Sequence, residues 1–174
     1  SYTFLGRYNG SWSVMNIKLL PDIIINEVMN NPNSVSDSDG EWFELFNNSN
    51  KSVNVNGWVF KDSGDDSLVI SNAAEIPAFE YFVLGSNGDY SINGGVIIDY
   101  EYNRDDFNLG NSDDEIIIYD NENNEIDRVE YDGGITFPDP NGRSMELIYA
   151  NLDNNDGVNW VESENRLGPD NYGT

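Results

Sequence analysis

The chain of 174 residues contains no cysteine and no histidine. The absence of cysteine excludes thiol catalysis, thiolate zinc sites and disulfide bonds, and the absence of histidine removes the most common general base and metal ligand. Basic residues are also scarce, because eight Lys and Arg stand against 32 Asp and Glu, for a net charge of -24. The eight are scattered along the chain, so the sequence predicts neither direct nucleic acid binding nor attraction to anionic membranes.

Long apolar patterns are missing as well. No run approaches the roughly 20 apolar residues of a membrane-spanning helix, and no segment of helical length shows a helical apolar period. Apolar residues fall instead in short blocks rich in branched and aromatic side chains, separated by Asn, Asp, Gly and Ser. Leu, Ile, Val and Phe make up 45 of the 174 residues, which is more than in disordered acidic chains. The pattern predicts a folded all-β sandwich or barrel.

The stretch from Gly40 to Asp62 is the centre of this prediction. It contains two aromatic-rich runs, 41–47 and 53–60, separated by a polar tetrapeptide at 49–52. Aromatic and branched side chains suit a pleated, half-buried surface. The order of run, turn and run therefore predicts a β-hairpin.

A second hairpin is predicted later in the chain. The runs 115–119 and 125–131 flank a turn rich in Asp and Asn. Asn9-Gly10 is a strong two-residue hairpin signal near the N-terminus. The N-terminal segment has two interpretations, an extra hairpin or part of a neighbouring domain. We therefore divide the chain into an N-terminal extension or extra hairpin, residues 1–20, and one β-sandwich domain, residues 21–174.

Several groups of residues resemble one known family. They are Ile24-Ile25-Asn26-Glu27-Val28, followed by Glu41 to Asn47 and Val53 to Phe60; Leu109 to Ile116, followed by Ile126 to Tyr131; and Gly142 to Leu147. Together they resemble the lamin tail domain in its bacterial form, over about residues 22–174. The resemblance implies an immunoglobulin-like antiparallel β-sandwich.

The resemblance also implies a function. In animals the family forms the globular tail of nuclear intermediate filaments and binds proteins and DNA, whereas bacterial members are accessory modules of secreted or surface proteins. The basic DNA-facing surface of lamins has no counterpart here, so direct nucleic acid binding is not expected. We expect a non-catalytic module of a larger exported bacterial protein, extracellular or at the cell surface. It would mediate attachment or positioning through a protein or cell-surface partner, without membrane insertion.

Glu27, Glu41 and Glu44 are candidate paired carboxylates for glycoside hydrolysis. Glutamates so near strand centres are unusual, because an ionised group inside a sheet is costly unless it is paired or hydrogen-bonded. Glu44, however, lies on the opposite face from Phe43 and Leu45, so an outward position or a bond to loop backbone is the simpler interpretation. We therefore expect no catalytic residue and no enzyme activity.

A calcium site is an alternative hypothesis, since calcium takes several oxygen ligands from carboxylates and carbonyls. Asp37, Asp39 and Glu41 around Gly40 resemble half of a calcium loop, although the full Asp-x-Asp-x-Asp-Gly order with a distant Glu is absent. Solvated loops are the other interpretation of the acidic segments. The candidate metal ligands are thus Asp37, Asp39 and Glu41, and calcium is the candidate cofactor.

Carbohydrate binding is also open, because exposed aromatic rings can stack on sugar rings. Tyr8, Trp12, Tyr100 and Tyr102 are the candidates, with packing in the core or across strands as the other interpretation. A calcium-dependent or carbohydrate-binding module with a polysaccharide partner therefore stands as the alternative to a protein-binding one.

Overall fold

The computed structural model describes residues 2–8, 11–17, 20–72 and 74–164, with side chains from residue 20 onward. The strands are β1 (Tyr2–Tyr8), β2 (Ser11–Ile17), β3 (Ile23–Met29), β4 (Trp42–Asn47), β5 (Val53–Asn54), β6 (Val59–Lys61), β7 (Ser67–Val69), β8 (Glu75–Ile76), β9 (Tyr81–Gly85), β10 (Tyr100–Glu101), β11 (Asp113–Tyr119), β12 (Glu125–Asp132), β13 (Met145–Leu147) and β14 (Trp160–Glu162). The described helices are single turns, α1 (Asp37–Gly40) and the 3-10 turn η1 (Gly157–Asn159). In this part of the chain no helix has the length and apolar character to cross a membrane.

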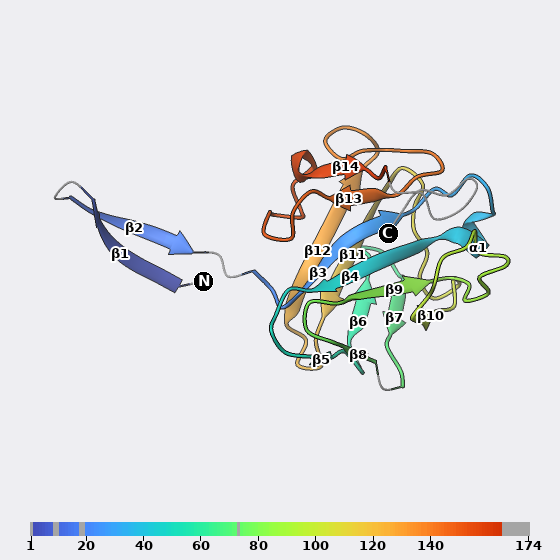
Figure 1. Ribbon diagram of the computed structural model, residues 1–174, viewed down its shortest axis with the longest axis horizontal. Coiled ribbons are helices and arrows are strands. Elements are labelled where there is room, and N and C mark those ends of the chain that lie inside the picture. The colour runs from blue at the N-terminus through green and yellow to red at the C-terminus, as the bar shows by residue number, and fades with distance from the viewer. Residues whose placement is uncertain (1, 9–10, 18–19, 73, 165–174) are drawn as a thin grey trace.

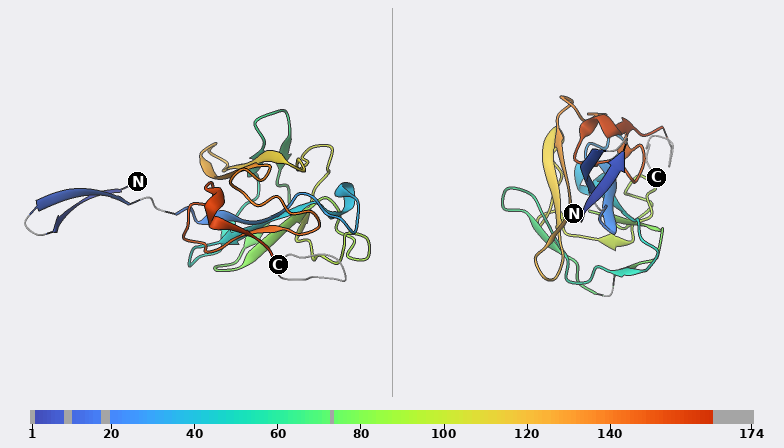
Figure 2. Two further views of the ribbon diagram at one scale, coloured as in Figure 1. Left: turned by 90° about the horizontal axis from the view of Figure 1, so that it is seen from above. Right: turned by 90° about the vertical axis from the view of Figure 1, so that its left-hand side faces the viewer.

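Two sheets pack face to face (Figures 1 and 2). The larger has the strand order β10-β9-β4-β3-β13-β14, and the smaller has the order β12-β11-β6-β7. Among the described strands every pair is antiparallel except β9 and β10, which run parallel. The predicted antiparallel β-sandwich is therefore confirmed, with one parallel pair at the edge of the larger sheet.

The core lies between the two sheets, and Phe43 of β4 is near its centre. The Phe43 ring centroid is 5.5 Å from that of Phe60 on β6 and 5.9 Å from that of Phe107. Each of these rings is fully buried, and full burial of such a side chain contributes roughly 1.5–3 kcal/mol. Because successive side chains of a strand point to opposite faces, Trp42 and Glu44 lie on the outer face of the larger sheet.

The hairpin predicted between 41–47 and 53–60 is wrong. β4 pairs with β3 and β9 in the larger sheet, whereas β6 pairs with β7 and β11 in the smaller one. Both runs carry an aromatic face, and in opposite sheets these faces bury each other, as Phe43 and Phe60 do. The chain therefore crosses from the larger sheet to the smaller one between β4 and β6, through the polar tetrapeptide and through β5, which pairs with β8.

The hairpin predicted at 115–131 is confirmed, and the N-terminal residues also form a hairpin. β11 and β12 are antiparallel neighbours, and so are β1 and β2, from Tyr2 opposite Ile17 to Tyr8 opposite Ser11. The predicted turn residues Asn9-Gly10 lie outside the described residues. Figure 1 shows the β1–β2 hairpin beside the sandwich, joined to it before β3. The division of the chain at residue 20 stays a prediction.

Asn47 fixes the crossover at the end of β4. Its side chain is fully buried. Nδ2 donates to three carbonyl oxygens at 2.7 to 2.9 Å, those of Lys51, Ile76 and Pro77. Oδ1 accepts hydrogen bonds from the backbone N and the Oγ of Ser49. One side chain therefore ties the loop after β4 to the segment that follows β8.

Asn47→Ala is expected to lower the free energy of unfolding by about 2–4 kcal/mol, because buried carbonyl groups lose their donor. Urea unfolding followed by tryptophan fluorescence measures the change. Asn121→Ala is the matched control, since Asn121 is exposed and its amide donates to one carbonyl, that of Asn56. It should change the free energy by less than about 0.5 kcal/mol, and equal effects of the two variants would contradict the role of Asn47.

Candidate functional site

The three candidate calcium ligands lie together in sequence before β4, but they bind different partners. Asp37 and Asp39 belong to the single turn α1, and Glu41 follows it. Asp39 accepts a hydrogen bond from Asn87 at 2.9 Å, and Asp37 accepts one from Asn111 at 3.2 Å. Each aspartate therefore connects α1 to a different loop by a hydrogen bond, Asp39 to the loop of Asn87 and Asp37 to that of Asn111.

Glu41 is paired with a cation of the chain itself. Its side chain has no exposed surface, and Arg104 donates to both carboxylate oxygens, from Nη2 to Oε1 at 2.8 Å and from Nε to Oε2 at 2.9 Å. Burial raises the pKa of the Glu41 carboxyl, and the guanidinium of Arg104 opposes that rise. Within residues 20–72 and 74–164, no group of three or more Asp or Glu has the arrangement of a metal site. The calcium site stays a prediction.

Thermal unfolding in EDTA and then in millimolar calcium tests that prediction. An ion bound only by the folded state raises the unfolding midpoint as its concentration rises. A calcium site would therefore give a rise that magnesium at the same concentration does not give. A midpoint that is the same in EDTA and calcium would contradict the site.

Glu27 and Glu44, the other candidate carboxylates, are register partners on β3 and β4. Glu146 of β13 is in turn the register partner of Glu27. Because register partners project from the same face, the three side chains form a row across adjacent strands, on the outer face of the larger sheet. We refer to Glu27, Glu44 and Glu146 as the glutamate row. Sequence reasoning missed Glu146, although its position between Met145 and Leu147 repeats the alternation around Glu44.

The glutamate row is largely buried and hydrogen-bonded. Glu27 is 2% exposed and Glu44 is 4% exposed. Asn26 Nδ2 donates to Glu44 Oε1 at 2.8 Å, and Ser144 Oγ donates to Glu27 Oε1. Burial, and next the charge of Glu27, raise the pKa of Glu44 to about 8. Glu44 therefore carries its proton at pH 7.

A cavity of about 490 Å³ opens at the end of the sandwich where the chain enters β3. We call it the end pocket. Its apolar lining comes from Leu20, Pro21, Ile24, Val53, Trp58, Ile126 and Leu152. Its polar lining comes from Asp22, Glu125, Asp127, Arg128, Asp153, Asn154 and Asn155. No member of the glutamate row lines it.

The end pocket carries net negative charge, with four carboxylates against one guanidinium. Arg128 is itself held by two carboxylates, with Nε 2.7 Å from Glu125 Oε1 and Nη1 2.5 Å from Glu130 Oε1. The hydrogen bond from Arg128 lowers the pKa of Glu125. Asp127 Oδ2 accepts hydrogen bonds from Ile25 N at 2.7 Å and from Asn154 Nδ2 at 2.6 Å. The carboxylates of the pocket thus include two that are fixed by neighbours.

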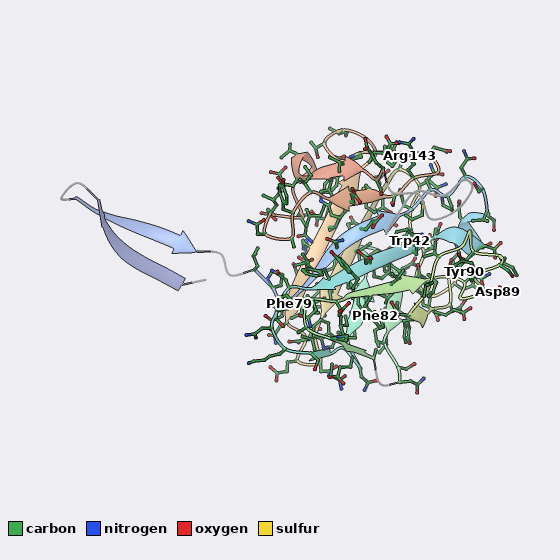
Figure 3. The ribbon with its side chains drawn as sticks, viewed as in Figure 1. Trp42, Phe79, Phe82, Asp89, Tyr90 and Arg143 are labelled. Carbon is green, nitrogen blue, oxygen red and sulfur yellow. The ribbon has the colours of Figure 1, made fainter. Side chains whose placement is uncertain are left out.

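Of the aromatic residues proposed for sugar stacking, Tyr102 is buried and Tyr100 is partly exposed. Tyr102 is 4% exposed, because its ring packs 6.0 Å from that of Phe107. The Tyr100 hydroxyl is bound by Ser71 N at 3.0 Å, and the side chains of Tyr8 and Trp12 lie outside the described residues. Exposed rings occur instead at positions that sequence reasoning missed, namely Phe79, Tyr81, Tyr90 and Tyr149. Figure 3 shows Phe79 and Tyr90 near opposite ends of β9. Polysaccharide binding stays a prediction, which a pull-down on insoluble polysaccharide tests.

The family model of the lamin tail domain matches residues 19–133, about two thirds of the chain. The match begins before β3 and ends after β12, so it includes all of the smaller sheet and both buried members of the glutamate row. A search of curated proteins gave no match.

Proposed function

Since the chain belongs to the lamin tail domain family, whose fold is immunoglobulin-like, we propose that it is a non-catalytic module that binds a partner protein. Domains of this family generally mediate protein interactions. In this proposal the chain is one module of a larger, exported bacterial protein. The module attaches or positions that protein at the cell surface by binding the partner. The acidic, cysteine-free composition of the chain supports the extracellular setting.

The end pocket is the observation that carries the proposal. Pockets that bind small molecules are typically concave, with an apolar lining and a few polar groups that fix orientation, and their volumes run from about 300 to 1,000 Å³. A single side chain of a partner protein is a ligand of comparable or smaller size. The end pocket has that volume and that division between apolar and charged side chains. It therefore offers a partner both buried apolar contact and directional polar contact.

The buried carboxylates support a non-catalytic role. Glycoside hydrolysis needs two carboxyl groups that flank a bound substrate. Glu41 instead binds Arg104, and Glu44 and Glu27 bind Asn26 and Ser144. None of the three glutamates lines the end pocket. Their hydrogen bonds join elements of the fold, which is a structural role.

Assays of the purified chain against chromogenic glycosides, phosphoesters and peptides test the non-catalytic proposal. We expect no turnover above buffer, with or without divalent cations. The Glu44→Gln variant, in which the proton-bearing carboxyl is replaced by an amide of similar shape, should behave identically. Hydrolysis by the wild type that Glu44→Gln abolishes would overturn the proposal.

A further inference from the structure

Taking the proposed function as its basis, we propose that the end pocket binds a basic segment of the partner protein. In this proposal one lysine or arginine side chain lies across the apolar lining, and its charged head meets the carboxylates. The shape, the lining and the charge of the pocket all suit such a side chain.

The apolar lining suits the stem of a long basic side chain. Lysine and arginine bury their methylene stems along apolar surface while the charged head stays at a polar boundary. Ile24 and Trp58 are 3% and 8% exposed, so they form a wall continuous with the core, and Val53, Ile126 and Leu152 pack against that core from the pocket side. The volume of about 490 Å³ leaves room for the backbone and for a neighbouring residue as well.

The charge of the pocket selects the sign of that head. Arg128, the cation of the pocket, is already paired with Glu125 and Glu130. Asp22 is exposed on the side where the chain enters β3. An acidic segment would meet like charges there, whereas a basic one would add an attractive pair. The net charge of -24 of the whole chain also steers basic partners toward it.

Titration with short peptides tests the proposal. The probes are four capped hexapeptides, Gly-Gly-X-Leu-Gly-Gly, in which X is Lys, Arg, Gln or Glu. Saturable chemical-shift changes in a ¹⁵N correlation spectrum should appear at the Trp58 indole and at residues 125–128 and 152–155. We expect the Lys and Arg peptides to bind at least tenfold more tightly than the Gln peptide, and the Glu peptide to give no saturation. Raising NaCl from 50 to 500 mM should weaken the Lys peptide several-fold.

Two charge reversals identify the source of the selectivity. Asp22→Lys should weaken the Lys peptide at least tenfold. Asp65→Lys is the matched control, because Asp65 is equally an exposed aspartate but does not line the pocket, and it should leave the affinity within about twofold of wild type. A well-dispersed spectrum of each variant shows that it is folded.

The outcomes separate this inference from the proposed function. The Lys and Gln peptides could bind the pocket equally well, with no effect of Asp22→Lys. That result would overturn the preference for a basic segment but leave the pocket as the docking site. If no peptide gives saturable shifts at the pocket, both claims are overturned, the preference for a basic segment and the pocket as the docking site. Hydrolytic activity would overturn the non-catalytic role alone.

Discussion

Arg104→Ala is expected to lower the free energy of unfolding by about 3–5 kcal/mol, because it leaves a buried carboxylate without its cation. The Glu41 side chain has no exposed surface, and its two oxygens accept hydrogen bonds from Arg104 at 2.8 and 2.9 Å. The backbone N of Leu109 adds a longer contact to Oε2, at 3.4 Å. This one amide cannot replace a bidentate guanidinium, so the remaining charge is poorly compensated. Urea unfolding at pH 7 measures the loss.

Arg128→Ala is the matched control for Arg104→Ala. Arg128 also binds two carboxylates, but its side chain is 34% exposed and its partners Glu125 and Glu130 are 39% and 43% exposed. Ion pairs in such surroundings contribute about 0–1 kcal/mol. The double variant Arg104→Ala/Glu41→Gln should regain more than half of the unfolding free energy that Arg104→Ala loses, because the amide of Gln is neutral and leaves no buried charge. If Arg104→Ala lowers the free energy of unfolding no more than Arg128→Ala does, the buried Glu41–Arg104 pair stabilises the fold no more than the exposed pairs of Arg128.

The Glu41–Arg104 pair also shows where sequence reasoning stops. Alternation of apolar and polar residues predicts strands, and it placed Glu44 correctly on the face opposite Phe43. The partner of Glu41, however, is 63 residues away, and no local pattern connects the two. Glu41 therefore stood as a calcium candidate from its neighbours Asp37 and Asp39, although its side chain turns toward a distant loop.

The end pocket was unpredictable for a related reason. Its lining comes from four separate segments, 20–24, 53–58, 125–128 and 152–155. These segments come together only because the chain crosses from β4 in the larger sheet to β6 in the smaller one. The sequence predicted a hairpin at that point instead of a crossing. Local propensity specifies a strand but not the sheet that it joins. The strands were accordingly predictable, and the site that their arrangement creates was not.

Between pH 5 and pH 9 the wild type is expected to lose about 4 kcal/mol of stability relative to Glu44→Gln. The pKa of Glu44 rises from 4.5 to about 8 on folding, and each pKa unit corresponds to about 1.4 kcal/mol. Below pH 4.5 the carboxyl is protonated in both states. Between pH 4.5 and 8 the folded state keeps a proton that the unfolded state has lost, so stability falls as the pH rises. Above pH 8 both states are ionised, and the difference becomes constant.

Glu44→Gln isolates this contribution from the other carboxylates. The amide of Gln mimics the protonated carboxyl and can still accept the hydrogen bond from Asn26. Subtracting the two pH profiles of unfolding free energy, measured in urea, removes the titration that the variants share. Glu146→Gln is the matched control in the same row, because Glu146 is only partly buried. Its profile should follow that of the wild type within about 1 kcal/mol.

The shape of the difference also bears on function. A gap that opens between pH 5 and 8 means that ionising Glu44 beside Glu27 strains the sheet, because both carboxyls are almost fully buried. Protonation of Glu44 then keeps a second buried charge from forming beside Glu27, which is a structural consequence of the raised pKa. Parallel profiles of wild type and Glu44→Gln would mean that Glu44 is solvated when it ionises. Solutes could then reach the glutamate row. Burial would no longer argue against a hydrolytic role of these carboxylates.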